Sequence, residues 1–194
     1  LYCFRGGLRS QTVQAWLQER TGVRYPLVNG GYKAMRRFLM DELERSLDAE
    51  RTELVIVAGK TGVGKTRVIH ELVRKNRSID LEGLADHRGS SFGASPENPR
   101  QKNLSQIDFE NAISLSLLKL LAASGDGLTG ELANTETQGK KRKRVFVEDE
   151  GSRIGCRTLP HALWSRMKKC DRLVMVEEDI EERTTMILED YVYD

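Results

Sequence analysis

The stretch LVIVAGKTGVGKT, residues 54–66, joins an uninterrupted aliphatic run to a glycine-rich turn. A short apolar run bounded by glycine is typical of a buried strand in a parallel sheet. Residues 59–66 match the pattern G-x-x-x-x-G-K-[ST] in full, and residues 66–76 place apolar side chains at helical spacing. The sequence therefore predicts a strand, a phosphate-binding loop (P-loop, Walker A motif) and a helix in direct succession.

Each residue type in this loop has a physical role. Glycines allow successive backbone N–H groups to turn inward around a di- or triphosphate, and the following helix adds its positive N-terminal dipole. Lys65 supplies a point charge and Thr66 a hydroxyl that can ligate Mg²⁺. The predicted phosphate-binding residues are Gly59, Gly62, Gly64, Lys65 and Thr66. Such a loop recognises an oligophosphate and not a base, so a nucleotide and another diphosphate ester both stay open as ligands.

A second apolar run ends in carboxylates. Residues 145–150 read VFVEDE, which predicts a strand followed by Glu148, Asp149 and Glu150. One of these acids could hold a metal ion beside the phosphate loop, directly or through water. A solvated loop is the alternative interpretation, and the sequence does not single out one acid.

Strands and helices alternate through residues 54–194. We expect a second strand ending near Leu81, a long loop, a helix over 107–123, a helix starting near Pro160, a strand over 172–178 and a final helix. The fold class is therefore α/β, with a P-loop NTPase-like parallel sheet covered by helices on both faces. Before it we expect a helix from Leu8 to Gly22, a short strand over Tyr25–Val28 and a long helix through Leu47, so residues 1–50 and 51–194 are predicted as two domains.

The opening residues form a Cys-x5-Arg loop that leads into a helix: Cys3, two glycines, then Arg9, with Arg5 between them. Backbone N–H groups and a helix dipole stabilise a thiolate, and arginines reinforce this effect. We therefore predict a low-pKa nucleophile at Cys3, with Arg5 and Arg9 as its partners. The same geometry serves rhodanese-type sulfur carriers and cysteine phosphatases.

A third cluster lies in DLEGLADHRGSSFG, residues 80–93, where His87 and Arg88 are placed among small residues. Loops at the carboxyl edge of an open α/β sheet are where ligands bind. We therefore treat His87 and Arg88 as possible ligand or metal-site residues, with a structural role as the alternative.

Composition sets limits on the class of protein. The chain has 194 residues, is 39% apolar and 31% charged and carries a net charge of +2, which indicates a globular protein. Its three cysteines form no CxxC pair, and this favours a reducing, cytoplasmic location. No apolar run reaches the length of a membrane helix, so we expect no membrane association. The five cations at 140–144 either attract a phosphate backbone or form a solvated loop.

Taken together, these motifs resemble the bacterial tRNA 2-selenouridine synthase family, in which a rhodanese domain is fused to a P-loop domain. The matching segments run in order through nearly the whole chain: YCFRGGLRSQ, NGGYKAMRRF, GKTGVGKT, DLEGLADHRGSSFG, SQIDFENAI, VFVEDEGSRIG and LPHALWSRM. By this resemblance residues 1–50 are the C-terminal portion of a rhodanese-like domain, and the chain is expected to be N-terminally truncated.

The resemblance implies a transferase that replaces sulfur by selenium in the wobble 2-thiouridine of tRNA. It also implies selenophosphate as the selenium donor, an S-geranyl-tRNA intermediate made from geranyl diphosphate, and a selenophosphate-supplying enzyme as a possible partner. Two other functions remain open on the residues alone. One is a P-loop ATPase or small-molecule kinase that does not act on RNA, and the other is a non-catalytic tRNA-binding fragment.

Overall fold

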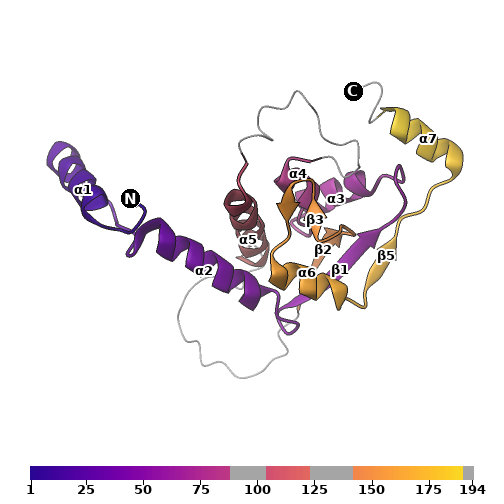
Figure 1. Cartoon of the computed structure of the whole chain (residues 1–194), viewed down its shortest axis with the longest axis horizontal. Coiled ribbons are helices and arrows are strands. Elements are labelled where there is room, and N and C mark those ends of the chain that lie inside the picture. Colours follow the sequence, from indigo (N-terminus) through magenta and orange to yellow (C-terminus); the bar gives the residue numbers. More distant parts are fainter. Residues whose placement is uncertain (88–103, 123–141, 190–194) are drawn as a thin grey trace. The chain divides into compact units, whose positions relative to one another are not determined.

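The computed structural model describes residues 1–87, 104–122 and 142–189 (Figure 1). Their contacts divide the chain into two compact units, Leu1–Glu42 and Leu43–Asp194. The long helix α2 (Gly31–Ser46) runs from the first unit into the second. The predicted domain division at residues 50 and 51, and the rhodanese-like assignment of the first part, stay predictions. Most of the predicted long loop and of the insertion over 124–144 lies outside the described residues.

The first unit contains α1 (Leu8–Thr21) and the beginning of α2. Helix α1 ends at Gly22, whose φ of 70° is left-handed, and this confirms the predicted stop. The predicted strand over Tyr25–Val28 is wrong. Pro26 and Val28 each make one backbone hydrogen bond to Leu1, at 2.6 and 2.9 Å, and these two bonds do not extend into a ladder.

The second unit is built on a parallel sheet in the order β2-β1-β5. The strands are β1 (Thr52–Ala58), β2 (Lys143–Glu148) and β5 (Leu173–Met175), and both neighbours of β1 run parallel to it (Figure 1). Every residue of β1 except Glu53 is buried, as a central parallel strand requires. The predicted α/β class with a parallel sheet flanked by helices is therefore confirmed.

Alternate residues of β1 lie on opposite faces of the sheet. Leu54 and Ile56 belong to the main core, which also contains Val145 and Val147 of β2. Around them lie the end of α2 and apolar side chains of α4 (Leu81–Ala85), α5 (Gln106–Ala122) and α6 (His161–Lys168). Helix α3 (Lys65–Arg74) contacts β1 and β2, and its Ile69 is fully buried outside that core, so α3 covers the other face.

The second unit differs from the prediction at two places. Residues before Leu81 do not form a strand, because Ser78 makes only an isolated parallel bridge to Phe146 and the chain then turns into α4. The Asp80 carboxylate caps this helix by accepting a hydrogen bond of 2.7 Å from the N–H of Gly83. An unpredicted hairpin joins β3 (Arg153–Ile154) to β4 (Arg157–Thr158), and its turn uses Gly155 at a φ of 55°.

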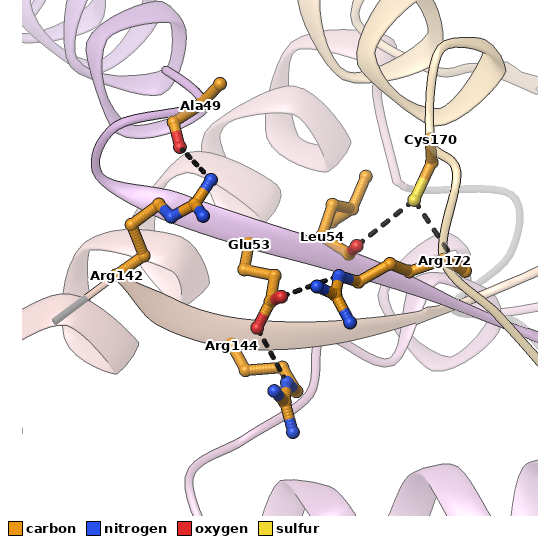
Figure 2. A network of polar contacts seen from close by, with 7 residues as sticks. All are labelled: Ala49, Glu53, Leu54, Arg142, Arg144, Cys170 and Arg172. Atoms are coloured by element: carbon orange, nitrogen blue, oxygen red, sulfur yellow. Dashed lines mark hydrogen bonds and ion pairs between the residues drawn. The ribbon is translucent and has the colours of Figure 1, made fainter.

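A charged clamp joins the three strands at the end of the sheet where β1 begins (Figure 2). The carboxylate of Glu53 in β1 contacts the guanidinium of Arg144 in β2 at 2.8 Å and that of Arg172, beside β5, at 2.6 Å. These hydrogen bonds and charges, led by Arg144, lower the pKa of Glu53. Cys170 extends the network because its Sγ donates to Leu54 O at 3.1 Å. The clamp lies at the opposite end of the strands from the phosphate loop.

The last helix, α7 (Ile180–Leu188), follows β5. Within the described ranges, no helix has the length and apolar character needed to cross a membrane.

Candidate functional site

The phosphate loop lies between β1 and α3, where the motif predicts it. Gly59, Gly62 and Gly64 have backbone φ values of 154°, 80° and 79°. Residues other than glycine rarely adopt these values. Space is also limiting: a Cβ on Gly59 would lie 2.5 Å from the carbonyl oxygen of Val176. The glycines are therefore required both for the backbone turn and for the close approach of the neighbouring segment.

Lys65 and Thr66 stand at the start of α3 and are held by different partners. The Lys65 ammonium folds back over the loop and donates to Gly59 O at 2.7 Å and to Lys60 O at 3.2 Å. The Thr66 hydroxyl donates to Glu82 Oε2 at 3.5 Å. The lysine thus spans the loop, and the threonine connects it to helix α4.

Glu148, the last residue of β2, is 1% exposed. Burial, followed by the charges of Glu82 and Asp80, raises the pKa of Glu148 to about 8. Its Oε2 accepts from the backbone N–H of Glu82 at 3.2 Å, and Oε1 has no hydrogen-bond partner among the described residues. One buried carboxylate oxygen is therefore left available beside the phosphate loop.

Glu150 differs from Glu148 in its relation to the loop lysine. Burial, then the side chain of Glu82, raises the pKa of Glu150 to about 8, while the charge of Lys65 acts in the opposite direction. Asp149 between them is exposed, and its backbone N–H continues the sheet by donating to Val57 O at 2.9 Å. The structure thus directs Glu148 and Glu150 toward the loop side and Asp149 outward.

Glu82 is a site residue that the sequence analysis missed. Its side chain contacts Thr66 and influences Glu148 and Glu150, so it joins the phosphate loop to the acids after β2. The available signal was its place in the DLEG segment, two residues after Asp80. No group of three metal-binding side chains occurs in the part of the chain that the structure describes. The three glutamates are therefore not placed to bind one ion together, and a hard cation held by one of them would take its other oxygen ligands from Thr66 and a bound phosphate.

His87 follows α4, and its backbone N–H donates to Glu82 O at 3.0 Å. Its ring packs on the hairpin turn, where a Cβ on Gly155 would lie 2.5 Å from His87 Cδ2. Its Nδ1 is buried and lacks a hydrogen-bond partner within the described ranges. Arg88, the other predicted residue of this pair, lies outside the described residues.

The Cys3 loop, described within the first unit alone, holds the sulfur among hydrogen-bond donors. Gly7 N–H donates to Cys3 Sγ at 3.2 Å, and the Ser10 hydroxyl oxygen lies 3.3 Å from the same sulfur. The Ser10 side chain, followed by backbone N–H groups of Ser10, Gly7 and Arg5, lowers the pKa of Cys3 to about 6, against an opposing effect of burial. The thiol therefore ionises readily near neutral pH, as a nucleophile requires.

Ser10 is the second residue that the sequence analysis missed. It is 4% exposed, and its hydroxyl donates to Gly7 O at 2.9 Å. The signal was its position directly after Arg9, at the end of the first turn of α1. Arg5 and Arg9 are exposed, and the leading causes of the lowered pKa are hydrogen bonds and not their charges.

The first turn of α2 holds the Cys3 loop in place through backbone hydrogen bonds. The carbonyls of Cys3 and Phe4 accept hydrogen bonds from the N–H groups of Tyr32 and Lys33 at 2.9 and 3.1 Å. A Cβ on Gly31 would lie 2.1 Å from Cys3 O, so only glycine fits there. The first turn of α2 thus satisfies its free N–H groups with the loop that carries the cysteine.

The other two cysteines and the described cations of the 140–144 run lie outside the phosphate loop and the Cys3 loop. All three cysteines are free; Cys156 is exposed, and Cys170 belongs to the clamp at the other end of the sheet. Of the five cations at 140–144, the structure describes Arg142, Lys143 and Arg144. They contact Ala49 O, Leu120 O and Glu53, respectively, so these three are engaged by the fold.

A family model and individual curated proteins point to the same family when this chain is compared with known proteins. The family model described as tRNA 2-selenouridine synthase AAA domain matches residues 52–194. A curated tRNA 2-selenouridine synthase of Alcanivorax borkumensis is 46% identical over 192 residues, and those of Cupriavidus pinatubonensis and Pseudomonas syringae are each 44% identical over 192 residues.

These matches cover 99% of this chain but 45% of each relative, so the chain spans about half the length of the curated relatives it matches. No solved structure matches the chain.

Proposed function

The chain belongs to the tRNA 2-selenouridine synthase family, and on that premise we propose that it takes part in replacing sulfur by selenium in wobble 2-thiouridine of tRNA. One observation carries the proposal for this chain: a loop of glycines at positive φ, with Lys65 bonded across it and carboxylates beside it. This arrangement suits a reaction in which an oligophosphate is bound and released.

The ligand of the loop is the oligophosphate group of geranyl diphosphate or the phosphate of selenophosphate. Both present oxygens to the amides of residues 59–66 and to the Lys65 ammonium. In the first step, the thiocarbonyl sulfur of the base attacks the allylic carbon of geranyl diphosphate, the carbon–oxygen bond breaks, and diphosphate leaves. Positive charge at the loop stabilises the negative charge that collects on the leaving group.

In the second step, the S-geranyl base is the electrophile. The selenium of selenophosphate attacks C2, the C2–S bond breaks, and geranylthiolate leaves and takes up a proton. Water then cleaves the phosphorus–selenium bond, which releases phosphate and leaves the selenocarbonyl, so no oxidant or reductant is consumed.

Cys3 assists this second step as an ionised thiol and forms no bond to selenium, so the step still needs no oxidant. Its lowered pKa, to about 6, keeps a large share of the sulfur anionic at neutral pH. Arg5 and Arg9 are exposed on the same loop and helix, where they can attract the anionic donor or the tRNA backbone.

Mg²⁺ fits the donor set at the phosphate loop. The Thr66 hydroxyl and the unpaired Oε1 of Glu148 would hold it together with phosphate oxygens of the ligand, and the ion would neutralise charge on the leaving diphosphate. We also assign tRNA as the nucleic-acid partner, an enzyme that supplies selenophosphate as a second partner, and a cytoplasmic location.

The test compares Lys65→Ala with Lys75→Ala, an exposed cation at the other end of α3. Geranylation and selenation of thiolated tRNA are measured separately, in this chain and at the matching lysine of a full-length relative. We expect Lys65→Ala to lower geranylation by tenfold or more while Lys75→Ala keeps it. Unchanged rates of both reactions in Lys65→Ala would contradict the proposal, and ATP turnover insensitive to tRNA would favour a P-loop ATPase or kinase.

A further inference from the structure

Helix α7 packs against the phosphate loop along its length. A Cβ on Gly62 would lie 2.8 Å from Arg183 O and 2.7 Å from Ile187 Cγ1, and one on Gly64 would lie 3.5 Å from Met186 Sδ. Figure 1 shows α7 as the helix that follows β5. Two glycines of the loop therefore leave room for this helix as well as for the backbone turn.

Polar contacts fasten α7 to the same region. Arg183 Nε–H donates to the carbonyl oxygen of Thr61, inside the loop, at 3.2 Å. Near the other end of the helix, the Glu189 carboxylate pairs with Arg67 of α3 at 2.8 Å. The helix is thus attached to the loop and to the helix that the loop begins.

Charge makes Arg183 distinctive. Residues 177–189 contain six acidic residues and one basic residue, Arg183. The planar guanidinium has five N–H donors. Its Nε is bonded to Thr61 O, and its terminal NH₂ groups have no partner among the described residues. The single cation of this acidic segment is therefore placed on the anion-binding loop with donors to spare.

We propose that α7 is a cover for the phosphate loop and that Arg183 is a phosphate-binding residue, which exchanges the Thr61 carbonyl for oxygens of a bound oligophosphate. The inference rests on the proposed function of the loop. A phosphate adds the attraction of opposite charges to the hydrogen bond, which the neutral Thr61 carbonyl does not supply, so an anion seated on the loop attracts this side chain. The arginine then adds a bidentate contact that backbone amides and Lys65 do not supply.

The test measures pyrophosphate affinity by titration calorimetry at fixed ionic strength for the unsubstituted chain, Arg183→Ala, Arg183→Lys and Arg74→Ala. Arg74 is an exposed α3 cation paired with Glu71, and it serves as the matched control. We expect Arg183→Ala to weaken binding about tenfold or more, Arg183→Lys to lose less, and Arg74→Ala to bind as the unsubstituted chain does.

Thermal unfolding without pyrophosphate separates binding from packing. If Arg183 only fastens α7, Arg183→Ala lowers the unfolding temperature but leaves the affinity equal to that of Arg74→Ala, and the inference is overturned. If Lys65→Ala abolishes binding while Arg183→Ala does not weaken it, the inference fails and the loop's function stands. If the unsubstituted chain does not bind pyrophosphate, both fail.

Discussion

The sulfur of Cys3 lies 3.3 Å from the hydroxyl oxygen of Ser10, and that hydroxyl also lies 2.9 Å from the carbonyl oxygen of Gly7. A hydroxyl has one proton, so it donates either to Gly7 O or to the sulfur. Ionisation of Cys3 favours the second arrangement, because a hydrogen bond to an anion is stronger than one to a neutral carbonyl. Ser10 thereby stabilises the thiolate.

Replacing this hydroxyl should raise the pKa of Cys3. We expect Ser10→Ala to move it from about 6 toward the ordinary value of 9.0, since the Ser10 side chain is the largest cause of the shift. At pH 6.5 the rate of alkylation by iodoacetamide should fall by about tenfold. The measurement is the pH dependence of that rate for Cys3, followed by peptide mass spectrometry so that Cys156 and Cys170 are excluded.

Other titratable groups around the sulfur must be controlled. Those on its own segment and on the start of α2, which packs against the loop, are Tyr2, Arg5, Arg9, Tyr32 and Lys33. Arg9→Gln and Lys33→Gln are the controls that remove charge, and Ser10→Thr keeps the hydroxyl. A pH profile of Ser10→Ala that matches the unsubstituted chain would rule out this role.

Glu148 should make the folded chain less stable as the pH rises. Its pKa is about 8 when folded and 4.5 ordinarily, so between these values the folded state binds more protons than the unfolded state. Stability then decreases with rising pH across that window. Glu148→Gln keeps the shape without the charge, so we expect it to flatten the decrease and to gain up to about 5 kcal/mol above pH 8.

The measurement for Glu148→Gln is urea unfolding at a series of pH values from 4 to 9, with Asp149→Asn, an exposed neighbour, as the control. Glu150, whose pKa is also raised to about 8, should leave a residual slope in the Glu148→Gln chain. An equally steep decrease in both variants would show that Glu148 is already ionised in the folded chain.

Glu53 should have the opposite dependence. Its pKa is lowered from the ordinary 4.5, first by the hydrogen bond from Arg144 and then by the charges of Arg144, Arg172 and Arg142. The stabilisation is fully present above the ordinary value and is lost as the pH falls through the lowered one. We therefore expect Glu53→Gln to lower the unfolding temperature at pH 7, by an amount that shrinks toward zero in acid.

The control for this clamp is Glu71→Gln, which breaks the exposed ion pair with Arg74 on α3. Isolated surface pairs contribute little, whereas Glu53 is 15% exposed and joins three strands. Equal unfolding temperatures for Glu53→Gln and Glu71→Gln would contradict a role for the clamp in holding the sheet together.

The sequence was most informative where local pattern and covalent spacing decide the structure. The run Leu54–Ala58 is too apolar for any place but the sheet interior, and the glycines after it tolerate backbone angles that other residues resist. The strand, loop and helix were therefore predictable. The sequence predicted that backbone N–H groups would surround Cys3, because the spacing of Cys3, Gly7 and Arg9 indicates a loop that leads into a helix N-terminus.

Contacts between distant segments were not predictable in the same way. Glu82 lies 16 residues after Thr66 and 66 before Glu148, and its role depends on how α4 packs beside the loop. Residues 78–81 looked like a strand because Ile79 and Leu81 are apolar. Asp80 instead caps a helix that begins at the next residue, Leu81. The hairpin strands have two residues each, too few for an alternating pattern to be visible.

The central claim is that the amides and the ammonium of residues 59–66 hold the oligophosphate group of a co-substrate. The most direct measurement is a crystal structure of the chain soaked with pyrophosphate and Mg²⁺. We predict an anion enclosed by the loop, with Lys65 Nζ moved from the carbonyls of Gly59 and Lys60 to phosphate oxygens. An unoccupied loop, with pyrophosphate bound elsewhere on the chain, would contradict the account.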